Sequence, residues 1–416
     1  AAAAALPPPP AVSNGEATNG TDKQVAHGTA TATATAAAAG AGAGAWGADG
    51  VLGGASLVLP TPPAVIAALL HEQYGDVDPA APAMLAALRN SAAPEVWHKH
   101  GSFLQHLRGV WRMLAAWGQP AKICRLGLFH SAYSNSFVSM SIFDPDHGRH
   151  ELRALIGDEA EDLVYTFCTI DREEFEMQLL KRDAIPPDGL DLTHIRTGES
   201  LHLSAETCGD FLMHTVADYM EQFFNWQEEL EAGRVGALWP GDCRPQARMA
   251  VLSRMARIAA RDGHLQSIPA FFDRCTALLD PDNERAARDA YVSAVVDVEK
   301  SGGSDAALQL LRTAAAKNPY VGEPHVMIAQ LHVQAGRWNE AQAAAASGLA
   351  RLYEWGTCWD KRVGWEGWVA WARCIHFQAR RAEWPETSGG VESLGAVDDA
   401  QRYRDLSVGS NFLRCE

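Results

Sequence analysis

Apolar residues recur at intervals of three and four along the chain from about residue 63 to about residue 230, which is the spacing of amphipathic helices. The clearest stretch has a broad apolar face made of Phe103, Leu104, Leu107, Val110, Trp111 and Leu114. The pattern predicts helices over residues 63–71, 80–90, 102–117 and 121–131, one that starts near residue 157, and a long one from Ser204 to about residue 230. Residues 134–150 lack the pattern and are predicted to form a loop.

Residues that end or begin helices separate these stretches. Gly118 follows one predicted helix, and Pro120 opens the next at its first turn. The helix near residue 157 begins with Asp158, Glu159 and Glu161, whose negative charges suit the positive end of a helix dipole. Residues 61–240 are therefore predicted to form a helical domain of the all-α class.

Beyond residue 242 the pattern repeats with an offset of 34 residues, which aligns Gly302 with Gly336 and Ala314 with Gly348. Over about residues 250–355 the spacing resembles that of tetratricopeptide repeats, which are pairs of helices that cross at small residues. The resemblance implies helical repeats over residues 245–385, and an irregular helical bundle is the alternative. Trp365, Trp368 and Trp371 follow at helical spacing, and they form either a core that caps the repeats or a groove of exposed indoles.

The ends of the chain and its composition add further expectations. Residues 1–60 are rich in Ala, Gly and Pro, which bury too little surface to offset chain entropy, so we expect disorder there and a tail over residues 386–416. A net charge of −16 and a pI near 5.4 argue against nucleic acid as a partner. We expect no membrane span, because no long uninterrupted apolar stretch occurs.

Scattered cysteines complete this picture. None of the eight lies at C-x-x-C or zinc-finger spacing, which indicates reduced thiols in an intracellular, cytoplasmic protein. The N-terminus leaves organelle targeting undecided.

Two histidines carry the chemical interest of the predicted helical domain. His106 lies within one predicted helix and His130 at the end of the next, with a Gly–Gln–Pro turn between the helices. Histidines on two packed helices, together with carboxylates, are how helical bundles build metal sites. The alternative is that both imidazoles are hydrogen-bonded packing residues.

The segments HLRGVWRMLAAWG, ICRLGLFHSAY and IGDEAEDLVYTF resemble an uncharacterised domain family, DUF6817, over about residues 90–235. That family is itself similar to the HD-type phosphohydrolases, notably the guanosine-tetraphosphate hydrolases. The resemblance implies that His106, His130 and Asp218 hold a divalent metal such as Mn, Fe, Zn or Co, and that Glu159 or Glu161 acts as a base. One departure is Ser131, which stands where HD enzymes have a metal-binding Asp.

Two functions follow from these features. The first is an interaction or scaffold protein that binds a protein or peptide partner through residues 245–385, with a degenerate HD-like domain as a structural unit. The alternative is a metal-dependent phosphohydrolase of HD type, in which a metal-activated water attacks a phosphoester and the repeats recruit a partner. No nucleic acid and no membrane is expected as a partner in either case.

Overall fold

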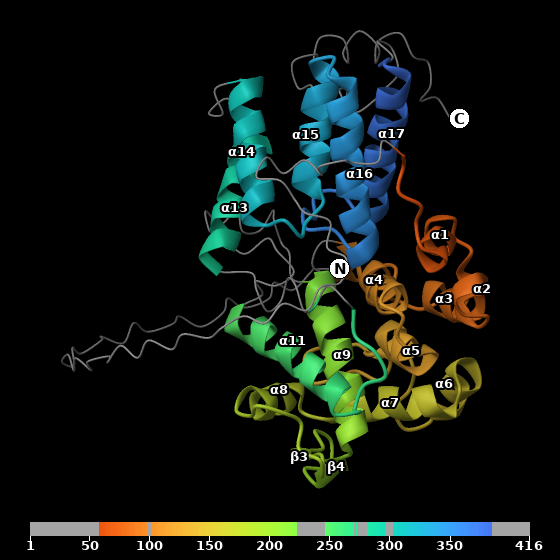
Figure 1. The fold of residues 1–416 in the computed structure, drawn as a ribbon. Coiled ribbons are helices and arrows are strands. Elements are labelled where there is room, and N and C mark those ends of the chain that lie inside the picture. Colours follow the sequence, from red (N-terminus) through yellow and green to blue (C-terminus); the bar gives the residue numbers. More distant parts are fainter. Residues whose placement is uncertain are drawn as a thin grey trace, which may run out of the picture. The chain divides into compact units, whose positions relative to one another are not determined.

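The computed structural model describes residues 58–98, 101–222, 246–269, 272, 281–295 and 303–384. Within these ranges the regular secondary structure is helical apart from two short hairpins, which confirms the predicted all-α class (Figure 1). Almost all of the segment predicted to be disordered, the expected tail over residues 386–416 and the end of the long helix near residue 230 lie outside the described residues.

The first helical region begins with three short helices, α1 (Ala64–Leu70), α2 (Tyr74–Val77) and α3 (Ala81–Arg89). A small hairpin of β1 (Trp97–His98) and β2 (Gly101–Ser102) leads into α4 (Phe103–Ala116) and α5 (Ala121–Phe129). Then come α6 (Arg149–Ile156), α7 (Asp158–Thr169) and α8 (Arg172–Leu180). The antiparallel strands β3 (Leu190–Thr193) and β4 (Ser200–Leu203) precede the long helix α9 (Ala205–Gln222).

Local sequence signals explain the start of α4 and the turn between α4 and α5. Ser102 begins α4 with a capping box, in which its hydroxyl accepts from the Gln105 backbone N–H while Gln105 Oε1 accepts from the Ser102 N–H. Gly118 ends this helix with φ of +70°, and Pro120 caps α5. At the crossing of the two helices, a Cβ on Gly127 would lie 2.5 Å from Leu114 Cδ1. The absence of a side chain at residue 127 therefore lets the two helices approach closely.

Helix α11 (Gln246–Arg261) packs against α9 and α8 of the first region. The second helical region contains α13 (Pro281–Val295), α14 (Ser304–Lys317), α15 (Glu323–Gln334), α16 (Trp338–Trp355) and α17 (Trp365–Arg381). Helices α15, α16 and α17 lie side by side (Figure 1). Gly336 adopts φ of +67° in the turn before α16, and a Cβ on Gly348 would lie 2.8 Å from Val326 Cγ2 of α15. Small residues therefore do lie where these helices cross. Gly302, the other glycine of the predicted repeat, lies outside the described residues.

Tryptophans pack inside this second region. Trp359, Trp365 and Trp368 are each only 1% exposed. The indole N–H of Trp365 donates to the Leu352 carbonyl at 2.7 Å, and that of Trp368 donates to the Asp360 carbonyl at 2.8 Å. Trp371 is half-buried and its ring stacks on Trp368. The cluster is a packed core, and the alternative of a groove of exposed indoles is wrong for Trp365 and Trp368.

Arg112 of α4 links the first region to α16 and α17. Its Nη1 donates to Glu366 Oε1 at 2.6 Å and its Nε to the Gly356 carbonyl at 3.0 Å. The guanidinium also lies over the Trp365 ring, 4.8 Å from the centroid. One side chain thus meets the end of α16 and the start of α17.

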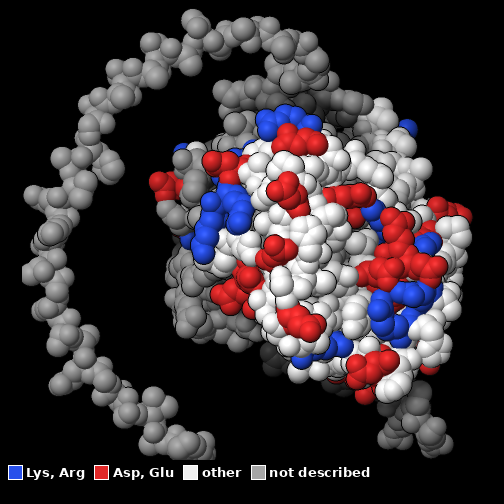
Figure 2. Space-filling model, turned by 90° about the horizontal axis from the view of Figure 1, so that it is seen from below, with Lys and Arg blue, Asp and Glu red and all other residues white. Residues whose placement is uncertain are grey.

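Surface charge and hydropathy complete the description. Among the residues that the structure describes, no helix is both long and apolar enough to cross a membrane. The face shown in Figure 2 carries acidic and basic side chains intermixed, without a broad area of Lys and Arg alone. Such a face lacks the concentrated positive charge that tracks a phosphate backbone.

Candidate metal site

Three donor atoms from three helices converge in the interior of the first region. His106 Nε2 of α4 lies 3.2 Å from Asp218 Oδ1 of α9 and 3.4 Å from Nε2 of His130, the residue that caps α5. His130 Nε2 lies 3.7 Å from the same Asp218 oxygen. The donor atoms of the three residues all lie within 4.8 Å of one another, and the side chains are almost fully buried. The structure therefore brings together the three residues predicted as metal ligands.

The outer nitrogen of each imidazole is engaged by a separate partner. His106 Nδ1 lies 2.5 Å from Glu221 Oε2, and His130 Nδ1 donates to the Gly127 carbonyl at 2.9 Å. Because each Nδ1 carries a proton toward its acceptor, each Nε2 is left to face Asp218. Carboxylate and carbonyl partners of this kind fix the ring orientation of metal-binding histidines in proteins.

The electrostatics of the cluster call for a positive charge at its centre. Burial lowers the pKa of His106, but its contacts with Asp218 and Glu221 outweigh burial and raise that pKa to about 9. Burial lowers the pKa of His130 to about 4. Burial opposes ionisation of Asp218 as well, yet the charges of His130, Arg172 and His106 hold its pKa well below the usual range. A proton on His106 thus supplies the central charge, and a divalent cation would replace that proton.

The donor set fits a divalent transition metal. Two imidazole nitrogens and one carboxylate oxygen form the set that suits zinc, iron, manganese and cobalt. Asp218 Oδ2 accepts from Arg172 Nη2 at 2.7 Å, whereas the buried Oδ1 makes no well-directed hydrogen bond. An unmatched carboxylate oxygen beside two imidazoles is what such an ion needs as a ligand.

The structure does not bring the two predicted bases to this cluster. Glu159 is exposed and its carboxylate lies 3.2 Å from Lys122 Nζ. Glu161 is buried, and it accepts from Arg149, Arg153 and Tyr133. Both residues of α7 therefore form ion pairs. Their shared position in an acidic first turn did not predict the direction in which each side chain points.

The hydroxyl of Ser131 is also engaged away from the cluster. It accepts from Asn135 Nδ2 at 2.8 Å, within the loop that follows α5. Ser131 therefore stabilises this loop, in line with the expectation that serine is a poor replacement for the aspartate of HD enzymes.

Four residues at the site were missed in the sequence. Glu221 orients His106, Arg172 holds Asp218, and the buried imidazole of His214 lies with its ring centroid 4.8 Å from that of His130. The fourth is Gly109, because a Cβ there would lie 2.5 Å from Glu221 Oε1. A usable signal was the stripe of His214, Asp218 and Glu221 on α9, at helical spacing.

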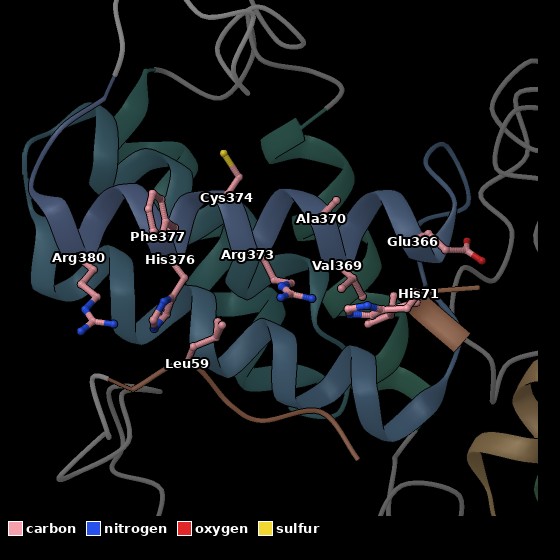
Figure 3. Close-up of a pocket in the computed structure, with 11 residues that line it drawn as sticks. Leu59, His71, Glu366, Val369, Ala370, Arg373, Cys374, His376, Phe377 and Arg380 are labelled. Atoms are coloured by element: carbon pink, nitrogen blue, oxygen red, sulfur yellow. The ribbon is translucent and has the colours of Figure 1, made fainter. Parts of the chain in front are cut away.

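A separate groove of about 680 Å³ runs along the outer face of α17. Figure 3 shows Arg373, His376 and Arg380 pointing from α17 to the side where Leu59 lies, with Cys374 pointing away. Neither Arg373 nor Arg380 makes an ion pair with any described residue, and Phe377 beside them is 57% exposed. This surface is mostly basic and apolar, with Glu366 at one end, in a chain whose net charge is −16.

Residues 87–172 match the family model of a domain of unknown function, DUF6817. This segment is similar to the DUF6817 family over those residues. The match to the DUF6817 model includes His106 and His130 but ends before His214, Asp218 and Glu221. The similarity to HD phosphohydrolases stays a prediction.

Residues 301–354 match a tetratricopeptide repeat model, which covers α14, α15 and nearly all of α16. A tetratricopeptide repeat supports a protein-interaction role. The two matches follow each other in the predicted order. Comparison with curated proteins and with solved structures gives no significant match.

Proposed function

We propose that residues 61–240, which include the segment similar to the DUF6817 family, bind one divalent transition metal ion through His106, His130 and Asp218. The observation that carries this proposal is the convergence of two Nε2 atoms and one carboxylate oxygen within 4.8 Å in the protein interior. Candidate ions are Mn, Fe, Zn and Co, because all accept nitrogen and oxygen donors.

Residues around the three donor side chains fix their orientation. Glu221 and the Gly127 carbonyl hold the two rings by their Nδ1 atoms. Arg172 holds the outer oxygen of Asp218 and offsets part of the negative charge that Asp218 and Glu221 bring. Little side-chain motion is then needed when the ion binds, which favours affinity.

Elemental analysis of the purified full chain tests this proposal. We expect about one equivalent of metal in the wild type and below about 0.1 in His106→Ala and His130→Ala. The control is His325→Ala in α15, which also removes a buried imidazole with an unmatched Nε2 but is expected to leave the metal content unchanged. A wild-type chain without metal after growth in metal-supplemented medium would overturn the proposal.

A second candidate is that this metal site catalyses phosphoester hydrolysis. The specific support is that three protein donors leave coordination positions open, as catalytic sites require. When bound, such an ion acts as a Lewis acid and activates water for attack on a phosphoester. Hydrolysis of p-nitrophenyl phosphate that disappears with a chelator, returns with metal and is lost in His130→Ala supports it. Equal rates in wild type and variant would contradict it.

The repeat region supports a partner-binding function. We propose that residues 245–385 bind an acidic peptide that carries an apolar side chain, with the groove along α17 as its site. The support is charge complementarity, because Arg373, Arg380 and the exposed Phe377 offer guanidinium groups beside an aromatic ring.

Fluorescence anisotropy with labelled peptides tests this site. Acidic peptides containing Leu or Phe should bind the full chain, and the double variant Arg373→Glu, Arg380→Glu should weaken binding by about tenfold or more. Arg89→Glu, an exposed arginine at the end of α3, is the matched control. Equal binding of basic and acidic peptides would overturn the assignment.

A further inference from the structure

His214 is a buried imidazole whose nitrogens have no hydrogen-bond partner. It lies one turn before Asp218 on α9, and its exposed fraction is 0%. Neither Nδ1 nor Nε2 makes a hydrogen bond. Its ring contacts are with His130 and, edge to face, with Phe167. A buried imidazole that leaves both nitrogens unmatched is costly, so its neighbours indicate what binds there.

Those neighbours form the candidate metal site. The His214 and His130 ring centroids are 4.8 Å apart, and those of His130 and His106 are 5.2 Å apart. Two imidazoles that share one ion in neighbouring positions have centroids about 4.6–5.3 Å apart, given metal–nitrogen bonds of about 2.1 Å. Both observed separations fall in that range. The nitrogens of His214 lie outside the group of donor atoms within 4.8 Å of one another, so His214 joins the site by turning its ring toward it. His130 is thus the central member of a row of three rings.

We propose that His214 is a fourth protein ligand of this metal site, which then consists of three imidazoles and the Asp218 carboxylate. The inference rests on the proposed metal site and extends its ligand set. It also explains how the site manages with Ser131, since His214 provides from α9 a donor that α5 does not. A neutral imidazole in place of a second carboxylate favours zinc, cobalt and iron over manganese or magnesium.

The test is cobalt binding by the full chain after its metal has been removed with a chelator. Co²⁺ absorbs visible light according to its ligands, so the spectrum reports the ligand set directly. Replacing His214 by Phe keeps a ring of similar size in the apolar surroundings. We expect His214→Phe to weaken Co²⁺ binding by about tenfold or more and to shift the visible absorption bands. The control His325→Phe should match the wild type in both respects.

A measurement on the unaltered chain guards against a variant that fails to fold. Pulsed electron paramagnetic resonance of the Cu²⁺-loaded wild type counts the imidazoles bound to the metal, and three are expected. Two bound imidazoles, or a His214→Phe chain with wild-type affinity and spectrum, would overturn the role of His214 alone. A wild-type chain that binds neither Co²⁺ nor Cu²⁺ would overturn the metal site itself together with this inference.

Discussion

The two helical regions both bury charged side chains, but they match them in different ways. In the second region, buried Asp360 accepts from Arg362 and from the Tyr291 hydroxyl, so both of its oxygens have partners. In the first region, Asp218 has one oxygen on Arg172, while the other faces two imidazoles without a well-directed hydrogen bond. Both carboxylate oxygens of Asp360 therefore have hydrogen-bond partners, whereas one oxygen of Asp218 has none.

This difference distinguishes a buried carboxylate that stabilises the fold from one that is placed to bind a ligand. A buried carboxylate is tolerated when every oxygen has a partner, because removal from water is costly. Unmatched atoms also occur in the second region, as in Asn318, His325 and Tyr353, but each is a single atom of its side chain. Around Asp218, unmatched atoms of three residues, Asp218 itself, His214 and Arg172, lie beside two further imidazoles. Clustering of the unmatched atoms, more than their occurrence, indicates a ligand.

The largest expected effect comes from the two arginine-paired aspartates. Asp218→Asn should abolish metal binding and lower the free energy of unfolding by about 3–5 kcal/mol, because Arg172 keeps a buried, uncompensated charge. Asp360→Asn should lower it by about 2–3 kcal/mol, since Arg362 is partly exposed, and leave the metal content unchanged. Elemental analysis and urea unfolding measure the two quantities. If circular dichroism shows that Asp218→Asn is folded and the variant still contains its full equivalent of metal, the distinction between the two regions is lost.

Two glycines give a smaller and more selective comparison. Gly109→Ala places a Cβ where Glu221 now reaches His106, and should weaken metal affinity by about 10- to 100-fold through loss of that orientation. Gly348→Ala crowds Val326 at the crossing of α15 and α16 and should cost about 1–3 kcal/mol of stability with no change in metal affinity. Metal titration by calorimetry distinguishes them. Wild-type affinity in Gly109→Ala would show that Glu221 does not position His106.

Local signals in the sequence were sufficient for much of the fold. The apolar periodicity and the Gly118–Pro120 turn predicted α4 and α5 to within a few residues, and the 34-residue offset matches the starts of α14 and α16. Short elements such as α2, α6 and α8 were missed. Helix α8 carries its apolar residues on no single face, so periodicity gave no signal.

The candidate site was predictable only in part. His106 and His130 were found because a short turn joins their helices, and Asp218 because a family resemblance implied it. Glu221 and Arg172 could not be placed, since their contacts join residues 115 and 46 positions apart in the sequence. Glu161 looked like a surface residue of an acidic turn, and only the structure reveals that two arginines cover it.

A pH-dependent effect is expected at Glu323, which is 1% exposed in the second region and accepts from the backbone N–H groups of Trp359 and Asp360. Burial raises the pKa of Glu323 to about 7. The folded chain therefore binds this proton more tightly than the unfolded chain, whose glutamate ionises near its ordinary value of 4.5. Stability from this group is complete below that value and is lost as the pH rises toward 7, by up to about 3 kcal/mol.

Glu323→Gln keeps the acceptor oxygen and removes the ionisation. The difference between its free energy of unfolding and that of the wild type, from urea unfolding followed by tryptophan fluorescence, should be close to zero at pH 4 and should increase toward pH 7.5. A difference that stays constant with pH would mean that Glu323 is ionised in the folded chain throughout. Added Zn²⁺ should not change the pH dependence of this difference. The Glu323 carboxyl group accepts from backbone N–H groups and takes up a proton, whereas the Asp218 carboxylate faces imidazoles and is placed to bind a metal ion.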